Sequence, residues 1–250
     1  MKKLACIAAL SILLVLICGP AAAVDQPVDA PIKVAVLPFV NKSLNPDFAY
    51  IGPMLVDALE YKIAAAGVFD LVDPALVHEQ IRSSSFDPSI FEGQEVIKRT
   101  GQNLDAEVML CGYYERSGGY LNLEVRIYDS QRGNIIIGTN GVSMYKEFFS
   151  SCDEIVLSLA QVCNVVLDAG AHSRMKSIPT NNLSAYATFV DALMASRSGR
   201  SAAALEFLDK ATSVDPGFCR ALRLAAKLAV AANDPSAAER SARAAQCTGR

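Results

Sequence analysis

The chain has 250 residues, with 23 basic and 26 acidic side chains, a formal net charge of −3 and no tryptophan. Removal of residues 1–23, which contain Lys2 and Lys3 and no acid, would leave 21 basic and 26 acidic residues and a net charge of −5. A surface of this charge repels phosphates, which argues against nucleic acid as a partner.

The N-terminus has the three parts of a cleavable export signal: the two lysines, an uncharged and mostly apolar run over residues 4–17, and a small-x-small cleavage site at Ala21-Ala22-Ala23. That run would span only about 21 Å as a helix, less than the ~30 Å hydrocarbon core of a membrane. We therefore expect residues 1–23 to be removed as a signal peptide, leaving a periplasmic product without a transmembrane segment. The alternative is an outer-membrane lipoprotein anchored through Cys18, although Ile17 before it is larger than the residue expected there.

Residues 32–168 predict an α/β domain. An apolar run over 33–40 is typical of a buried strand, and the apolar spacing over 48–66 is that of an amphipathic helix ending at Gly67. The remaining elements are expected as a strand at 68–72, helices at 74–82 and 93–100, strands at 106–114, 121–127 and 135–142, and a helix with an apolar stripe over 152–166. This order predicts an α/β sandwich with a mixed sheet.

Residues 170–182 are polar and unpatterned and are predicted to be a linker. Residues 183–250 are alanine-rich and helical, and two alanine pairs are each 34 residues apart: Ala204 with Ala238, and Ala211 with Ala245. A period of 34 with small residues at helix crossings is typical of tetratricopeptide (TPR) repeats. We therefore expect a short all-α region of two TPR-like repeats.

Several motifs together resemble a known family. Residues 34–41 (VAVLPFVN) resemble the opening strand of TolB-like N-terminal domains, which share an α/β fold with FlgO-like and curli-secretion (CsgG-like) proteins. Residues 105–119 are similar to the hairpin that follows in that family, and residues 123–133 to its next strand and turn. Leu104 departs from the pattern, which has glycine there. The resemblance implies an envelope scaffold or assembly factor with TPR repeats after the α/β domain, and it supplies no active site.

No catalytic, cofactor or metal site is predicted. The sequence has no GxSxG, HExxH, Walker or GxGxxG pattern. His78 and His172 have no second metal ligand nearby in the sequence. We therefore expect a protein that is not an enzyme.

The predicted repeats offer a candidate binding surface for a protein or peptide partner of the envelope. Tyr186, Phe189 and Leu193 share a stripe of the first repeat helix, and the corresponding positions of the second repeat are Arg220, Arg223 and Lys227. Such a groove would suit an extended peptide with acidic groups or a C-terminal carboxylate. The alternative is an ordinary solvated helix face.

Two repeats seldom form a stable core alone, because each depends on its neighbour. We expect the helices to dock on the α/β domain or to self-associate. Of the five cysteines beyond the signal, Cys219 and Cys247 would lie opposite each other in a helical hairpin and are predicted to form a disulfide; the alternative is two free thiols.

These observations predict a non-catalytic, exported interaction or scaffold protein, in which the α/β domain serves assembly and the repeats capture a partner. The alternative is a CsgG-like subunit that oligomerises into an outer-membrane secretion pore. The hairpin predicted around residues 113–121 is shorter than the membrane-inserted hairpins that such a pore would need.

Overall fold

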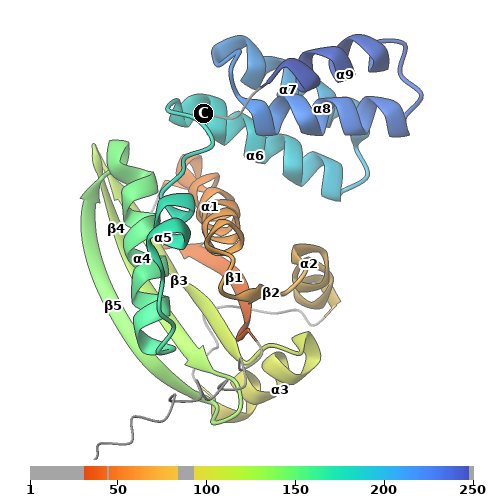
Figure 1. The fold of residues 1–250 in the computed structure, drawn as a ribbon. Helices are drawn as coiled ribbons and strands as arrows, with labels where there is room; N and C mark the ends of the chain where they lie inside the picture. Colours follow the sequence, from red (N-terminus) through yellow and green to blue (C-terminus); the bar gives the residue numbers. More distant parts are fainter. Residues whose placement is uncertain (1–30, 44, 84–92, 248–250) are drawn as a thin grey trace, which may run out of the picture. The chain divides into compact units, whose positions relative to one another are not determined.

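The computed structural model describes residues 31–43, 45–83 and 93–247. The predicted signal peptide and Cys18 therefore lie outside the described residues. A five-stranded mixed sheet has the order β2-β1-β3-β4-β5 (Figure 1). Strand β1 is parallel to β2 and β3, and the pairs β3–β4 and β4–β5 are antiparallel. The strands are β1 (Lys33–Asn41), β2 (Asp70–Leu71), β3 (Val108–Ser117), β4 (Tyr120–Asp129) and β5 (Asn134–Met144).

Helices cover both faces of the sheet. They are α1 (Ile51–Ala66), α2 (Pro74–Ser83), α3 (Gln94–Leu104), α4 (Phe148–Val162) and α5 (Ala169–Met175), with short 3-10 turns at Pro46–Phe48 and Tyr145–Glu147. Because side chains alternate between the faces of a strand, Val34 and Val36 of β1 pack with α1 and α4, whereas Ala35 and Leu37 pack with α2 and α3. The expected α/β class and mixed sheet are confirmed.

The predicted boundaries hold best where local chemistry fixes them. Helix α1 ends at Gly67, which has the positive φ of 70° that a left-handed C-cap requires. The helix predicted to close the α/β domain is shorter than expected. It ends at Val162, and Val166, expected on its apolar stripe, is 86% exposed.

The segment predicted as a linker is helical in its first half. Helix α5 occupies 169–175, and its Met175 is fully buried against the core. Arg174 donates to the carbonyl oxygens of Ala65 and Ala66 at 3.1 and 3.0 Å, so it caps the C-terminus of α1. The sequence pattern missed this helix because it is too short to show a period.

The C-terminal region consists of α6 (Leu183–Arg197), α7 (Ser201–Val214), α8 (Cys219–Ala231) and α9 (Ala237–Gln246). Helix α6 packs on α7, α7 on α8, and α8 on α9. Both α6 and α8, and likewise α7 and α9, begin 36 residues apart, not 34. Ala204 and Ala211 are buried, but Ala238 and Ala245 are exposed, so the aligned alanines do not occupy equivalent positions. The TPR assignment stays a prediction.

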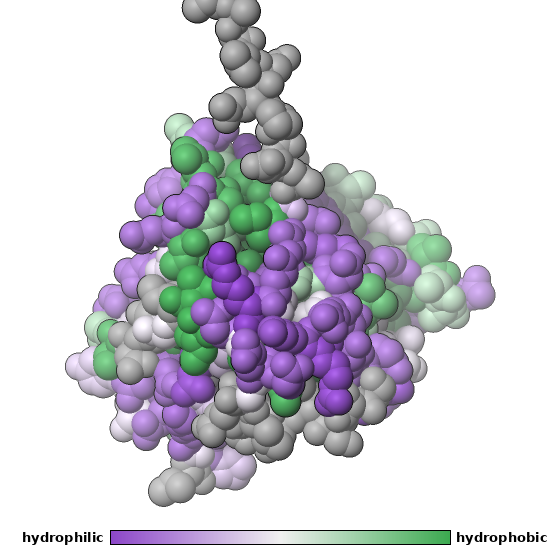
Figure 2. All heavy atoms as spheres, turned by 90° about the horizontal axis from the view of Figure 1, so that it is seen from below, coloured by the Kyte–Doolittle hydropathy of each residue, from purple (hydrophilic) through white to green (hydrophobic). Residues whose placement is uncertain are grey.

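Docking of the helices on the α/β domain, one of the two expected arrangements, is present. Tyr186 and Phe189 of α6 and Ala225 of α8 belong to the same hydrophobic cluster as α1 and α4. Seen from below, the surface is largely hydrophilic, with a band of hydrophobic residues running through it (Figure 2). None of the helices in the described part of the chain is both long and apolar enough to cross a bilayer.

Candidate functional site: a pocket between helices α1, α2 and α6

Helix α1 buries three ionisable side chains beside its apolar stripe. Asp57, Glu60 and Lys62 are 6%, 8% and 0% exposed. Burying a charge is costly unless it finds a partner, and each of the three pairs with a residue far away in the sequence. Lys62 bonds to Asp153 of α4 and to the carbonyl oxygens of Met175 and Ser177, which joins α1 to α4 and to the end of α5.

Asp57 anchors the C-terminal helices. Arg220 of α8 donates from Nη1 to Oδ2 at 2.8 Å and from Nη2 to Oδ1 at 2.9 Å, which is a bidentate pair. The hydroxyl of Tyr186 donates to Oδ2 at 2.6 Å. Burial, and then the nearby Asp57 carboxylate, raise the pKa of Tyr186 well above its ordinary value, so this hydroxyl stays a donor. The guanidinium of Arg220 also lies over the rings of Tyr61 and Phe189, with its central carbon 4.7 and 4.9 Å from the two centroids.

These contacts correct the predicted partner groove. Tyr186 and Phe189 are 0% and 2% exposed, and Arg220 neutralises Asp57, so these three residues bind within the chain. The sequence spacing placed them on one stripe, but it could not show that α1 would cover that stripe. Of the other predicted residues, Arg223 and Lys227 are exposed on α8 and Leu193 is half-buried on α6. Arg223 donates to the Cys247 carbonyl oxygen at 3.2 Å.

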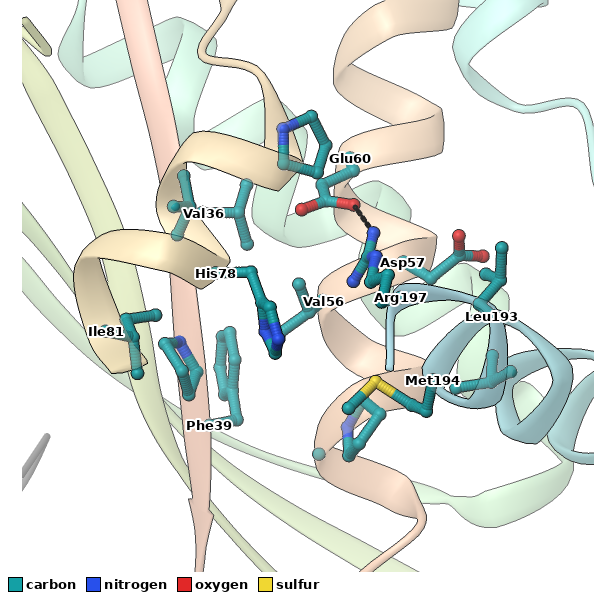
Figure 3. A pocket seen from close by; sticks show the side chains of 16 residues that line it. Val36, Phe39, Val56, Asp57, Glu60, His78, Ile81, Leu193, Met194 and Arg197 are labelled. Carbon is teal, nitrogen blue, oxygen red and sulfur yellow. Dashed lines mark ion pairs between the residues drawn. The ribbon is translucent and has the colours of Figure 1, made fainter. Parts of the chain in front are cut away.

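A pocket of about 180 Å³ remains beside this anchored contact, where α6 passes α1 and α2. Figure 3 shows apolar side chains from all four neighbouring elements pointing into it, with Glu60 and Arg197 paired at one side. Its lining residues are Val36, Pro38 and Phe39 from β1; Gly52, Pro53, Val56, Asp57 and Glu60 from α1; Pro74, Val77, His78 and Ile81 from α2; and Val190, Leu193, Met194 and Arg197 from α6.

Among the residues that line this pocket, Glu60 has a strongly raised pKa. Burial raises the pKa of its carboxyl from 4.5 to about 7, against the opposing effect of Arg197. The ion pair to Arg197 measures 3.7 Å, longer than a hydrogen bond, so the carboxylate keeps acceptor capacity toward the pocket. The residue is invisible to motif searches. The sequence around it offers only one other acid on the same helix, Asp57, three residues earlier.

No catalytic residues were predicted from the sequence, and the pocket presents mostly aliphatic and aromatic side chains together with Asp57, Glu60, His78 and Arg197. Its lining is mainly aliphatic, and the thiol of Cys111 lies in the other hydrophobic cluster, where burial raises its pKa to about 12. Across residues 31–43, 45–83 and 93–247, no three His, Cys, Asp or Glu side chains are grouped so that they could hold a metal ion.

The predicted cysteine pair lies apart from the pocket, at the α8–α9 hairpin. Cys219 and Cys247 have their Cα atoms 5.5 Å apart and their sulfur atoms at bonding distance. Arg240 of α9 also makes a bidentate pair with Asp209 of α7, at 2.6 and 2.9 Å. The disulfide stays a prediction that peptide mapping can test.

Comparison with known proteins gives structural similarities alone. No family model matches the chain, and no curated protein matches it. The LpoB C-terminal domain from Salmonella enterica is 19% identical in sequence; the match covers 48% of this chain and 87% of the LpoB chain, with a TM-score of 0.35. Lipoprotein GNA1162 from Neisseria meningitidis is 13% identical, with coverage of 52% and 97% and a TM-score of 0.41.

TolB from Acinetobacter baumannii is 14% identical over 54% of this chain and 29% of its own length, with a TM-score of 0.37. All three TM-scores are below 0.5, so these similarities assign no function to the chain.

Proposed function

We propose that this chain is a non-catalytic, exported interaction protein of the bacterial cell envelope. In this proposal the α/β domain and helices α6–α9 act as one binding body, and the pocket between α1, α2 and α6 receives a side chain from an extended segment of a protein partner. The signal-like N-terminus supports export, and the shared hydrophobic cluster supports one body.

The pocket carries the proposal. A cavity of about 150 Å³ lined by aliphatic side chains is large enough for benzene, so about 180 Å³ accommodates one aromatic or aliphatic side chain. The Glu60 carboxylate lies 3.7 Å from Arg197, beyond hydrogen-bond distance, so it would accept a hydrogen bond from a partner lysine or arginine next to that side chain. The preferred partner segment therefore has an apolar anchor residue followed or preceded by a basic one.

Selection from a displayed library of random peptides tests this function. We expect the peptides enriched on residues 24–250 to share an apolar anchor with a neighbouring basic residue. Met194→Trp should fill the pocket and weaken the binding of those peptides at least about tenfold, a loss of about 1.4 kcal/mol. It should leave the circular dichroism spectrum unchanged.

Val230→Trp is the matched control, because Val230 lies on α8, is 58% exposed and does not line the pocket. Peptides that bind Met194→Trp as tightly as the unaltered chain would refute the assignment of the pocket. Enriched peptides with no apolar anchor would refute the proposed recognition chemistry.

A further inference from the structure

A groove of about 130 Å³ lies between helix α4 and β5, the outermost strand of the sheet (Figure 1). Buried aliphatic side chains form its floor: Leu123 and Val125 of β4 and Ile155 of α4. Its exposed rim includes Gly141 of β5 and Glu154 of α4. The groove shares no lining residue with the pocket between α1, α2 and α6, so it is a separate site.

Gly141 opens the groove. It pairs with Leu123, whose side chain packs with α4, so a side chain at position 141 would point the same way. Among the described residues, no atom beyond those of its chain neighbours lies within 4 Å of the place that a Cβ would take. Its φ does not lie in the left-handed region either. Neither packing nor backbone conformation requires glycine here, and a glycine inside a strand often marks a place where a ligand or another backbone approaches closely.

The outer edge of β5 can accept a further strand. Among the described residues β5 pairs only with β4, and its sequence NIIIGTNGVSM contains neither a charged residue nor a proline, which commonly protect such edges. The N–H of Tyr145, just after the strand, donates to the carbonyl oxygen of Gly119 on the β4 side at 2.7 Å. Because successive residues of a strand direct their N–H and C=O groups to opposite sides, Val142 and Met144 present theirs to the open edge.

We propose that this groove binds an extended segment of a partner protein, which adds to β5 as a further strand and places an aliphatic side chain beside Gly141. A residue opposite Gly141 would point its side chain to the α4 face, over the floor of the groove. Main-chain hydrogen bonds to the strand edge supply the affinity, and the groove supplies the specificity. At about 130 Å³ it is smaller than the cavity of about 150 Å³ that admits benzene, so a valine or leucine fits it better than an aromatic residue.

Charge indicates a second residue of the segment. Glu154 is exposed and makes no ion pair among the described residues, and no lysine or arginine lines the groove. A lysine or arginine of the segment would pair with it. Since side chains on one face of a strand recur at every second residue, that cation lies two residues from the aliphatic one.

The same charge argues that the segment belongs to another protein. The β5 strand of a second copy contains no basic residue. Residues 24–30 and 84–92 of this chain, which lie outside the described part, contain none either. None of these three segments supplies the cation that Glu154 lacks.

Selection of displayed random peptides on the Met194→Trp variant of residues 24–250 tests this site. That substitution fills the other pocket, so the outcome here is independent of the proposed function. We expect the enriched peptides to share a valine or leucine with a lysine or arginine two residues away. Adding Gly141→Val should fill the groove and weaken their binding at least about tenfold. Adding Glu154→Gln should weaken it about threefold, because the lost ion pair is exposed.

Gly138→Val is the matched control. Gly138 lies on the same strand and also has no atom beyond its chain neighbours within 4 Å of its Cβ position, but it is three residues from Gly141 and therefore faces the opposite side of the sheet. Valine favours a strand at either position, so both variants should keep the circular dichroism spectrum unchanged. Gly138→Val should bind the enriched peptides within about twofold of the chain without it.

N-methylation of successive residues of an enriched peptide tests strand addition. Alternate N–H groups of an added strand face β5, so binding should be lost at every second position only. The proposal is overturned by a selection that enriches no peptide, by equal binding to Gly141→Val and Gly138→Val, or by losses without this alternation. A discrete dimer of the unaltered chain that Gly141→Val dissociates would instead assign the groove to a second copy.

Discussion

The ionisation of Glu60 should make the folded state less stable as pH rises from about 4.5 to about 7. The pKa of its carboxyl is about 7 in the folded chain, whereas the ordinary value is 4.5. Between these two values the folded chain binds the proton more tightly than the unfolded chain does, so raising the pH favours unfolding. The stabilising effect of the protonated carboxyl is complete below pH 4.5 and is lost by about pH 7.

The substitution Glu60→Gln isolates this effect, because the amide has nearly the shape of the protonated acid and does not ionise. The difference between the two pKa values, at about 1.4 kcal/mol for each pH unit, corresponds to about 3 kcal/mol. At pH 8 the variant should therefore be about 3 kcal/mol more stable than the unaltered chain. At pH 4 the two should be nearly equal.

Urea unfolding followed by circular dichroism between pH 4 and pH 8 measures this difference. Glu206→Gln on α7 is the matched control, since Glu206 is exposed and the same change there should have little effect at any pH. A free-energy difference between Glu60→Gln and the unaltered chain that does not change with pH would refute the reasoning. So would a variant that is less stable at pH 8, because the Arg197 ion pair would then outweigh the cost of burial.

Three further predictions concern the contacts that hold the C-terminal helices and the buried thiols. Asp57→Asn should lower the free energy of unfolding by about 3 kcal/mol, because it leaves Arg220 without its charge partner. Replacing Asp57 by leucine and Arg220 by methionine together should lower it by less. Urea unfolding compares the two variants, and equal losses would contradict the assigned pair. Replacing Cys219 and Cys247 by serine should lower the free energy of unfolding by roughly 3 to 4 kcal/mol on the chain-entropy model, and should speed amide hydrogen exchange in α9. Non-reducing peptide mapping that finds both thiols free would contradict this prediction. Burial raises the pKa of the Cys152 thiol to about 12. Iodoacetamide at pH 8 should therefore alkylate Cys152 in urea but not in the folded chain. Mass spectrometry that finds Cys152 modified in the folded protein would contradict this.

The sequence predicted much of the α/β domain because its signals are local. The apolar run of β1, the alternation over residues 121–127 and the Gly67 cap each depend on neighbours within a few residues. Helix α5 was missed for the same reason: it is held by distant contacts, with Arg174 on the end of α1 and Met175 in the core.

The candidate site was beyond the reach of those signals. Asp57 and Arg220 are 163 residues apart, and Glu60 and Arg197 come together only because α6 crosses α1. An acid on an amphipathic helix is ordinarily solvated, and nothing near residue 60 in the sequence shows that a second helix covers it.

The sequence by itself determined the acidic charge, the signal-like N-terminus, the α/β class, and the two cysteines suited to a helical hairpin. Only the tertiary structure decided what the predicted partner residues do. It buried Tyr186 and Phe189 against α1, where their aromatic rings complete the core, and it paired Arg220 with Asp57, whose buried carboxylate would be costly without a partner. It thereby moved the candidate binding surface from the helical groove to the pocket beside Glu60.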